Sequence, residues 1–504
     1  MKGFPPPPEI GQVTVAETNG DLTTVGSAHV QDSLQVLCSG YPQVTVLPEN
    51  SRNSVPRESA KSAFLPHDET VWKRALNAWY EHGFTGSFEE LVNSKDDVPS
   101  IIASTSTSCL TLLRWATSLN GSLFPHLSLS NEDLITKFTT ISDWSHSPIR
   151  AFAWHPHVTK FAYALHDDSI KVHSMGNTLV PVLKHKLQKY VADISWQPLS
   201  ASVLAVACQT CVLIWHIDPT SLAARPSASC VQVLNQSGHS PVTSLSWHPD
   251  ASILLSASPT DTAIMAWKVA METGVTLRRA GGGGVSFLKF SPEGSKVLAA
   301  TPMSMFRVWD AVTWNCEVWS KLSGRCNSAC WSPDDQILLF TMANDPIIYS
   351  ITFGRNHMDV AGGTNETSKS NMAVPIADLS EIEITTESGI IVKIGGCIQD
   401  MKWDKTGKRL AVLFQEGCNH HVALFKTSIY PVIDLIPCGL IQGKENERAH
   451  HISFQPSYTE GALLTVVWSS GRVGYIPLQF ATHQDNLKHP CDIGHSGINL
   501  YTDM

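Results

Sequence analysis

The sequence predicts an all-β protein, a seven-bladed β-propeller of the WD-repeat type with an N-terminal helical insert and an N-terminal hairpin. One observation is a recurring aromatic-x-Pro corner, and the other is an alternating strand about 20 residues after each corner. The corners are Trp154–Pro156, Trp196–Pro198, Trp247–Pro249, Phe290–Pro292, Trp331–Pro333 and Phe454–Pro456, with a degenerate copy at Trp403–Gly407. The strands that follow are 170–173, 212–215, 264–267, 306–309, 347–349, 422–425 and 472–475. The corners are 42, 51, 43, 41, 72 and 51 residues apart, as expected for blades of roughly 40–45 residues with insertions, so we favour the propeller over a β-sandwich with chance corners.

The segment Gly238–Trp267 shows the blade pattern in full. Val242–Trp247 alternates as a strand, and His248–Asp250 is typical of a turn. Two further strands follow, and the second ends at Trp267. Four side chains of this blade can satisfy one another as a buried polar relay. The expected members are His239, a strand hydroxyl from Ser256 or Ser258, Asp261 and the Trp267 indole.

Residues 1–65 form an N-terminal extension that opens with the stiff run Pro5–Pro8. Asn19–Asp21 lies between two alternating segments, a pattern typical of a β-hairpin. After Tyr475 little chain remains to complete the last blade. Since a ring closes best when one chain end supplies a strand to the other end's blade, we expect a strand near Val13–Val15 to pair with the final blade.

Residues 66–145 change to a helical period and predict about four helices. The helices are marked by the apolar face Trp72, Ala75, Leu76 and Trp79, the cap Ser87–Glu90, the apolar positions of 109–119 and the cap Ser130–Asp133. A segment of about 80 residues cannot form a large independent core, so we expect it to pack on the propeller. Two interpretations stay open, a docking element for a partner and a lid over the propeller. Trp72 and Trp79 are the candidate docking aromatics, because a thin helical layer needs less apolar surface than they supply.

The propeller is expected at 146–480, followed by a polar tail at 481–504. A stretch rich in Gly, Asn and Ser at 354–372 predicts a disordered surface loop inside one blade.

Charge and hydropathy limit the classes of partner. The chain of 504 residues has a formal net charge of −9 and is 43% hydrophobic. An acidic balance argues against a general polyanion-binding surface, so we expect no direct contact with nucleic acid. The Pro-rich start is unlike a signal peptide, and no apolar run reaches the roughly 18–20 residues that span a bilayer. We therefore expect any membrane association to go through a partner protein.

The chemistry-bearing residues do not form a catalytic pattern. The 12 cysteines are scattered without a disulfide framework, which indicates a reducing compartment. Cys208–Cys211 has CxxC spacing but no second pair to complete a zinc site, so we interpret it as structural. His420–His421 and His450–His451 are adjacent on strands and point to opposite faces, which disfavours shared metal binding. We predict no enzyme activity, no cofactor and no metal.

Several segments go beyond the generic blade pattern. They are Leu113–Leu129, Phe152–His157 followed by Leu165–Val172, Leu199–Gln209, Leu322–Cys326 and Ile436–Gly443. The opening Phe4–Pro8 and Gly11–Thr14 belong with them. Together these segments closely resemble the Aladin family of WD-repeat nucleoporins, over nearly the whole chain.

The resemblance implies a non-enzymatic scaffold or adaptor subunit of the nuclear pore complex, held at the nuclear envelope by a transmembrane nucleoporin. It further implies other nuclear pore proteins as partners, a monomeric subunit, a link to protein and mRNA transport, and a role at the mitotic spindle and its poles.

Two other functions remain open. A different propeller adaptor, such as a ubiquitin-ligase substrate receptor, needs an Asp-x-Arg motif after a blade's aromatic, and Trp309–Val312 lacks the Arg. An enzyme with its site in the central channel would need carboxylates or histidines gathered at the channel mouth.

Overall fold

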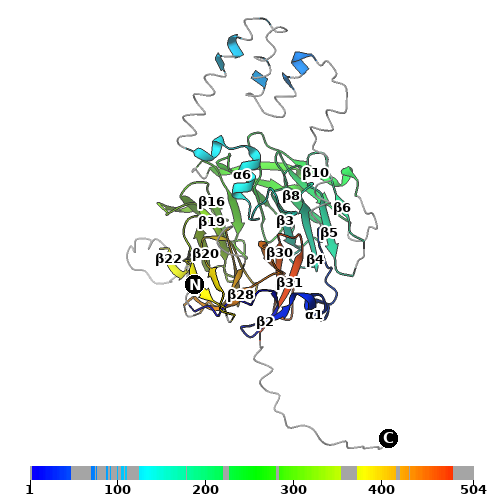
Figure 1. Ribbon diagram of the computed structural model, residues 1–504. Helices are drawn as coiled ribbons and strands as arrows, with labels where there is room; N and C mark the ends of the chain where they lie inside the picture. Colours follow the sequence, from blue (N-terminus) through cyan, green and yellow to red (C-terminus); the bar gives the residue numbers. More distant parts are fainter. Residues whose placement is uncertain are drawn as a thin grey trace, which may run out of the picture.

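The strands of the computed structural model form a ring of blade-like sheets (Figure 1). The structure describes residues 3–46, scattered residues between 70 and 109, and 124–480 apart from short gaps, the longest of which are 219–225 and 354–371. Within these residues there are six four-stranded sheets, one five-stranded sheet and one additional hairpin. This is the seven-bladed propeller that the repeated corners predict.

The first three blades follow one another along the chain. Blade 1 consists of β3 (Ile149–Trp154), β4 (Lys160–Leu165), β5 (Ile170–Ser174) and β6 (Val182–Leu183). Blade 2 consists of β7 (Asp193–Trp196), β8 (Val203–Ala207), β9 (Val212–His216) and β10 (Val231–Leu234), preceded by η3 (Ala228–Cys230). Blade 3 consists of β11 (Ser244–Trp247), β12 (Leu254–Ala257), β13 (Ala263–Lys268) and β14 (Thr273–Arg279), with η4 (Val269–Met271) before its last strand.

Blades 4 to 6 continue the pattern. Blade 4 consists of β15 (Phe287–Phe290), β16 (Lys296–Ala300), β17 (Met305–Asp310) and β18 (Cys316–Ser320). Blade 5 consists of β19 (Cys326–Trp331), β20 (Ile337–Met342), β21 (Ile347–Thr352) and β22 (Val374–Asp378). Blade 6 consists of β25 (Ile398–Trp403), β26 (Arg409–Phe414), β27 (Val422–Ser428) and β28 (Asp434–Ile441). The hairpin β23 (Ile382–Thr385) and β24 (Ile391–Ile394) lies between the last two in sequence, and the corner pattern did not predict it.

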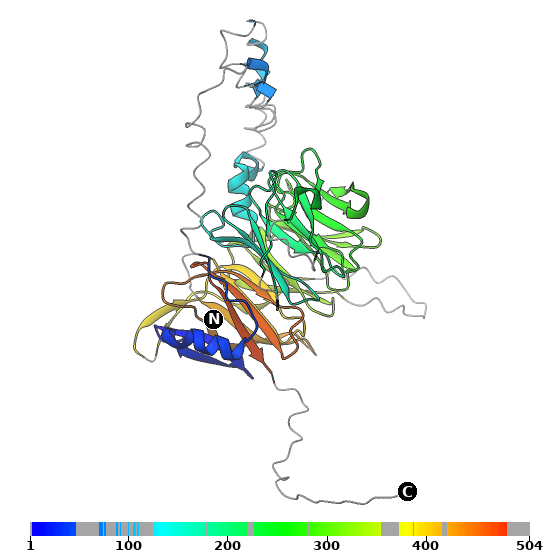
Figure 2. The same cartoon turned by 90° about the vertical axis from the view of Figure 1, so that its right-hand side faces the viewer.

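The last blade is completed from the opposite end of the chain. Its own strands are β29 (Ala449–Phe454), β30 (Ala462–Trp468) and β31 (Val473–Gln479), and the N-terminus adds β1 (Gln12–Thr18) and β2 (Asp21–Gly26). β1 runs parallel to β31, with Glu17 opposite Leu478, which is the pairing expected for the strand near Val13–Val15. Figure 2 shows this blue hairpin beside the orange and red strands of the last blade. The unpaired edge of β31 is thereby removed.

The N-terminal arm, residues 3–46, also contacts the two blades beside blade 7. On blade 6, the ring of Phe4 packs edge-on against Phe425 at 5.0 Å between centroids. After η1 (Ser27–His29) and α1 (Val30–Leu37), the chain runs antiparallel to the start of β31, where the Val46 amide donates to the Gly471 carbonyl at 2.9 Å. Tyr41 lies between blades 7 and 1, with its ring 6.2 Å from that of Trp154. The arm therefore holds three consecutive blades across the point where the ring closes.

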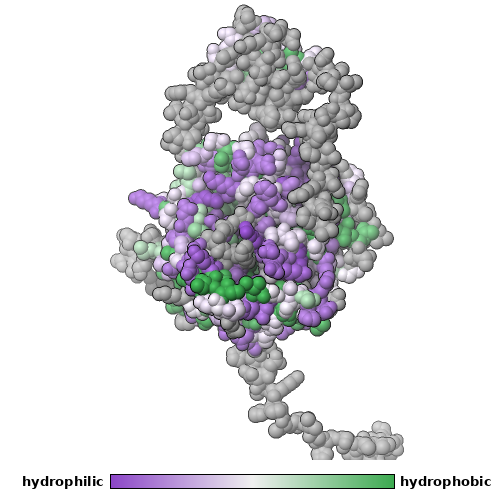
Figure 3. Space-filling model, viewed as in Figure 1, coloured by the Kyte–Doolittle hydropathy of each residue, from purple (hydrophilic) through white to green (hydrophobic). Residues whose placement is uncertain are grey.

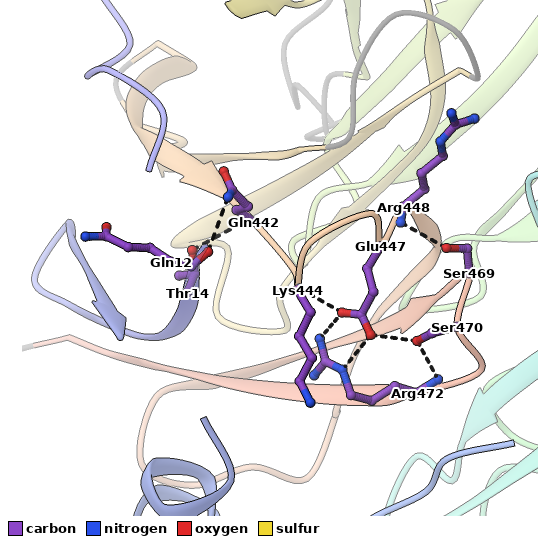
Figure 4. A network of polar contacts seen from close by, with 9 residues as sticks. All are labelled: Gln12, Thr14, Gln442, Lys444, Glu447, Arg448, Ser469, Ser470 and Arg472. Carbon is purple, nitrogen blue, oxygen red and sulfur yellow. Dashed lines mark hydrogen bonds and ion pairs between the residues drawn. The ribbon is translucent and has the colours of Figure 1, made fainter. Parts of the chain in front are cut away.

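A buried ion pair stiffens the loop before β29 next to the arm. Glu447 accepts hydrogen bonds from the Arg472 guanidinium at 3.0 Å, the Ser470 hydroxyl at 2.6 Å and the Lys444 amide at 2.8 Å (Figure 4). Burial opposes ionisation of this carboxyl, yet these partners hold the pKa of Glu447 below its usual value. In the same view, the Thr14 hydroxyl of β1 accepts from the backbone amide of Gln442 at 3.1 Å.

The helical segment is described only in part. Helical residues occur between 71 and 109, and the small cluster of Val71, Ala75 and Leu91 is the apolar packing described there. α6 (Asn131–Phe138) is the fourth expected helix, and its cap is the expected one, since Ser130 Oγ accepts from the Asp133 amide at 3.2 Å. None of the described helices is long and apolar enough to cross a membrane. The expected loop at 354–372, apart from its last residue, and the tail at 481–504 lie outside the described residues.

Candidate functional site

The polar relay expected in blade 3 is present. His239 Nδ1 lies 2.9 Å from Asp261 Oδ2, and His239 Nε2 lies 2.8 Å from Ser256 Oγ. The Trp267 indole donates to the same Ser256 hydroxyl at 2.8 Å. Ser256 is thus the strand hydroxyl of the relay, while Ser258 contacts Thr260 instead. The relay joins the loop before β11 to β12 and β13, so its role is to hold one blade together.

The corner tryptophans join neighbouring blades. In three of them the indole N–H donates to a carbonyl on the innermost strand of another blade. These bonds run from Trp196 to Ala153 at 3.2 Å, from Trp247 to Ser195 at 3.2 Å and from Trp331 to Lys289 at 3.3 Å. In blade 1 the Trp154 indole donates to the Thr465 hydroxyl of blade 7 at 3.0 Å. The repeated corner therefore carries an inter-blade contact in addition to the turn that the sequence indicates.

A short segment that precedes blade 1 lies across one end of the ring. This segment, called the cap here, comprises residues 124–147 and includes η2 (Pro125–Ser128) and α6. Its hydrogen bonds reach four different blades at the starts of their innermost strands. They join His126 to the Gly283 carbonyl at 3.0 Å, Arg325 to the Lys137 carbonyl at 3.1 Å, Ser142 to the His450 carbonyl at 3.0 Å and Trp144 to the Val191 carbonyl at 3.0 Å. Figure 1 shows α6 at this end of the propeller.

Trp144 anchors the cap. Its ring is fully buried in one apolar cluster with Ile135 and Ile141 and with residues of blades 2 and 3. The guanidinium of Arg150 lies 4.1 Å from the ring centroid, a cation–π contact. This part of the helical segment acts as the lid that the sequence left as one of two interpretations.

The cap covers a cavity of about 620 Å³ in the central channel. Phe138, Thr140 and Ile141 of the cap line one end of it. The Pro residues of five corners line the cavity where the innermost strands end, together with the exposed side chains of His157 and Lys405. The cap therefore lies over one mouth of the channel, and the corners surround the other mouth.

Besides His157 and Lys405 near the corners, five ionisable side chains from four blades line this cavity. They are Asp193 on β7, Lys289 on β15, Asp400 and Lys402 on β25, and His451 on β29. The sequence analysis did not identify this cluster, because each of these strands contributes only one or two such residues. Only the ring brings them together, which is why a strand-by-strand search of the sequence missed the cluster.

The two carboxylates are engaged within the protein. Asp193 accepts from the backbone amides of Leu245 and Ile194, both at 2.9 Å. Asp400 accepts from the Ser328 hydroxyl at 2.7 Å and pairs with the Lys402 ammonium at 2.9 Å. Amides on the channel-facing edge of an innermost strand have no further strand to bond. Side chains such as Asp193 supply those partners.

Burial shifts the pKa values of several residues in the cluster. Desolvation raises the pKa of Asp193 to about 6, lowers that of Lys289 to about 8 and lowers that of His451 to about 4. Burial also disfavours the charge of Asp400, yet the neighbouring cations, Lys402 foremost, hold its pKa below the usual value. At neutral pH the cluster therefore holds two carboxylates, two ammonium groups and a neutral imidazole.

Among the described residues that were considered for metal or docking roles, only His451 lines this cavity. His450 Nδ1 contacts Ser147 Oγ at 3.0 Å, while the adjacent His451 lines the channel, so the two imidazoles diverge as expected on a strand. The described residues contain no group of three potential ligands that could hold a metal ion. Cys208 and Cys211 flank the turn between β8 and β9 as buried free thiols.

The candidate docking aromatics are only partly described. Trp72 is 58% exposed, and Trp79 lies outside the described residues. Figure 3 shows a mostly hydrophilic surface with a compact hydrophobic area on the side where β22 and β28 lie. Exposed apolar side chains of the elements on that side include Val374, Ile391 and Ile436.

The family model and a curated relative point to the same family. A family model described as the Aladin seven-bladed propeller matches residues 130–479. A protein named Aladin from Arabidopsis thaliana is 27% identical over 373 residues, which cover 68% of this chain and 79% of that protein. A chain in the crystal structure of a mitotic checkpoint complex is 15% identical, with a TM-score of 0.48, over 68% of this chain and 92% of that chain. The match through the whole propeller shows that this chain belongs to the Aladin family.

Proposed function

We propose that this protein is a non-enzymatic scaffold and adaptor subunit of the nuclear pore complex, attached to the nuclear envelope through a transmembrane nucleoporin. The observation that carries the proposal is the family match from the cap to the end of the last blade. In this function the protein supports nucleocytoplasmic transport of protein and mRNA. A role in mitotic spindle assembly, with a location at the spindle poles, belongs to the same proposal.

The contacts that hold the ring together support a scaffold function. The ring is held by contacts between blades and by the arm across its closing point, which makes a rigid body with a broad outer surface. The carboxylates in the channel bond backbone amides, a hydroxyl and a lysine of the protein itself. Such a body is suited to hold partner proteins at fixed positions, with affinity that depends on a few aromatic or arginine anchors.

The helical segment is the proposed docking element for the membrane anchor. Its last part is the cap, so its earlier part is attached to the same end of the ring. The half-exposed ring of Trp72 does not join the cluster of Val71, Ala75 and Leu91, so it is accessible to a partner. Trp79 is proposed as a second anchor of the same kind.

Localisation of the tagged full chain in cells tests the function. We expect a punctate nuclear rim that disperses when the membrane nucleoporins of the pore are depleted. A diffuse signal both with and without depletion would overturn the proposal. Affinity purification would then test the alternative, an adaptor such as a ubiquitin-ligase substrate receptor.

A further inference from the structure

The central channel has the form of a small-molecule site. Its cavity of about 620 Å³ lies within the range of roughly 300–1,000 Å³ that is usual for ligand pockets. The cap covers part of one mouth, and the corners leave the other mouth as the wider entrance for a ligand. The walls combine corner rings such as Trp196 and Trp247 with the five ionisable side chains described above.

The hydrogen-bonding capacity that remains in the cavity is mainly that of donors. Both carboxylates already accept bonds from the protein, and Asp400 Oδ2, which has no hydrogen-bond partner among the described residues, is held by its ion pair with Lys402. Lys289 makes no ion pair among the described residues, and its ammonium donates to the Ala329 carbonyl at 3.1 Å. An ammonium has three N–H groups, so a single bond leaves two of them available.

His451 adds a second group without a partner. Its side chain is buried, with the residue 6% exposed, and no hydrogen-bond partner for its Nδ1 lies in the part of the chain that the structure describes. Buried polar atoms are normally paired, so an exception calls for an explanation such as a functional role. His451 lies within electrostatic reach of Lys402, which in turn neighbours Lys289.

Desolvation of these groups works against stability. A partly buried ammonium without an ion pair costs free energy, and so does an unpaired imidazole nitrogen. Natural sequences keep such local conflicts mainly at functional sites. An anion beside Lys289 would give the remaining N–H groups of its ammonium an acceptor.

We propose that the channel binds the oxyanion group of a small molecule, a carboxylate or a phosphate, through Lys289, Lys402 and His451. Lys289 supplies the ammonium that has no carboxylate partner. Lys402 supplies a second ammonium while it remains bonded to Asp400, and His451 donates from its imidazole. The aromatic corners at the open mouth enclose the rest of the ligand. The site is independent of the proposed role in the nuclear pore.

The test is a calorimetric titration of the full chain with inorganic phosphate and, separately, with citrate, each against sodium chloride at the same ionic strength. We expect saturable binding of at least one oxyanion, and the two titrations decide between phosphate and carboxylate. No saturable heat for either probe, or a heat that chloride reproduces, would overturn the proposal.

Two variants locate the bound anion. Lys289→Met keeps the length of the side chain and removes its charge, so we expect at least tenfold weaker binding together with a higher Tm of the unliganded protein. His451→Leu is the second variant, and we expect at least tenfold weaker binding from it as well. It identifies the binding site if Lys289→Met does not fold. The matched control is Lys268→Met at an exposed position of β13, which should bind as the native chain does. Unchanged affinity in a folded Lys289→Met or His451→Leu protein would rule the site out.

Discussion

Blade 3 and blade 7 are each held in place by buried polar contacts, but the contacts differ in sequence separation. In blade 3 the relay joins His239 to Asp261, which are separated by 22 positions in the chain. In blade 7 the closing strand is fixed by Glu17, which pairs with Arg409 of blade 6 across 392 positions. Both guanidinium bonds to that carboxylate are short, 2.7 and 3.1 Å, and the two side chains are 0% and 2% exposed.

The difference shows which contacts of a propeller are visible in its sequence. A relay inside one blade has to fit one short stretch of chain, so its residues keep a recognisable spacing. Ring closure brings together residues from the two ends, and no spacing records it. We therefore expect changes at the closing point to affect the whole ring, and changes in the relay to affect mainly one blade.

The largest effect is expected from removal of the closing strand. Deletion of residues 1–26 removes Phe4 and β1 and leaves Arg409 without Glu17, so the loss of unfolding free energy should exceed the ~3–5 kcal/mol typical of breaking one buried ion pair. Chemical denaturation measures it. Ile10→Ser, at a position of the same arm that is 62% exposed, is the control and should change little. Unchanged stability of the deletion variant would contradict the closing role of the arm.

Breaking the ion pair alone should have the next largest effect. Arg409→Met leaves the Glu17 carboxylate buried and unpaired, so we expect a loss of ~3–5 kcal/mol in urea unfolding. Adding Glu17→Gln in the same chain removes the unpaired charge and should restore part of the loss. A double variant that is no more stable than Arg409→Met would show that the buried charge is not the cause.

A smaller and more local effect is expected in blade 3. Ser256→Ala removes the hydroxyl shared by His239 and the Trp267 indole, leaving two buried groups unpaired, which should cost about 2–3 kcal/mol. Hydrogen exchange should accelerate first in β11–β13 and least in blade 7. Ser258→Ala, which lies outside the relay, is the control. Equal acceleration in every blade would contradict a blade-specific role of the relay.

The stability difference between Lys289→Met and the native chain should depend on pH. The pKa of Lys289 falls from 10.5 to about 8 on folding, so between these values the unfolded chain binds the additional proton and stability rises with pH. Lys289→Met should therefore be more stable than the native chain at pH 7, on the order of 1–3 kcal/mol, and the advantage should shrink between pH 8 and 10.5. Lys160 titrates in the same range in both proteins and cancels. Urea unfolding at several pH values measures the difference, and a constant advantage would exclude deprotonation of Lys289 as its cause.

The smallest effect on stability is expected at Trp72. Its ring is 58% exposed, so Trp72→Ala should change the unfolding free energy by no more than about 0.5 kcal/mol. If the helical segment docks the anchor, the same variant should weaken the nuclear-rim signal. Ile391→Ser, at an exposed apolar position outside the helical segment, is the matched control for localisation. A normal rim with Trp72→Ala and a lost rim with Ile391→Ser would move the docking surface to the side of blades 5 and 6.

Features with a local cause were predictable from the sequence. The corners, the alternating strands, the relay of His239 with Trp267, and the capped start of α6 each depend on residues close together in the chain. The hairpin around Asn19 was predictable for the same reason, and ring closure followed from the incomplete last blade.

The tertiary structure alone decided how distant residues meet. The closing ion pair of Glu17, the cap contacts of Trp144 and the channel cluster around Lys289 each combine residues that no local spacing connects. Four of the seven innermost strands supply one or two ionisable residues each, which look isolated in the sequence. Closure of the ring places them around one cavity, because every innermost strand faces the same axis. The sequence thus determined the blades, and the geometry of the ring determined the site.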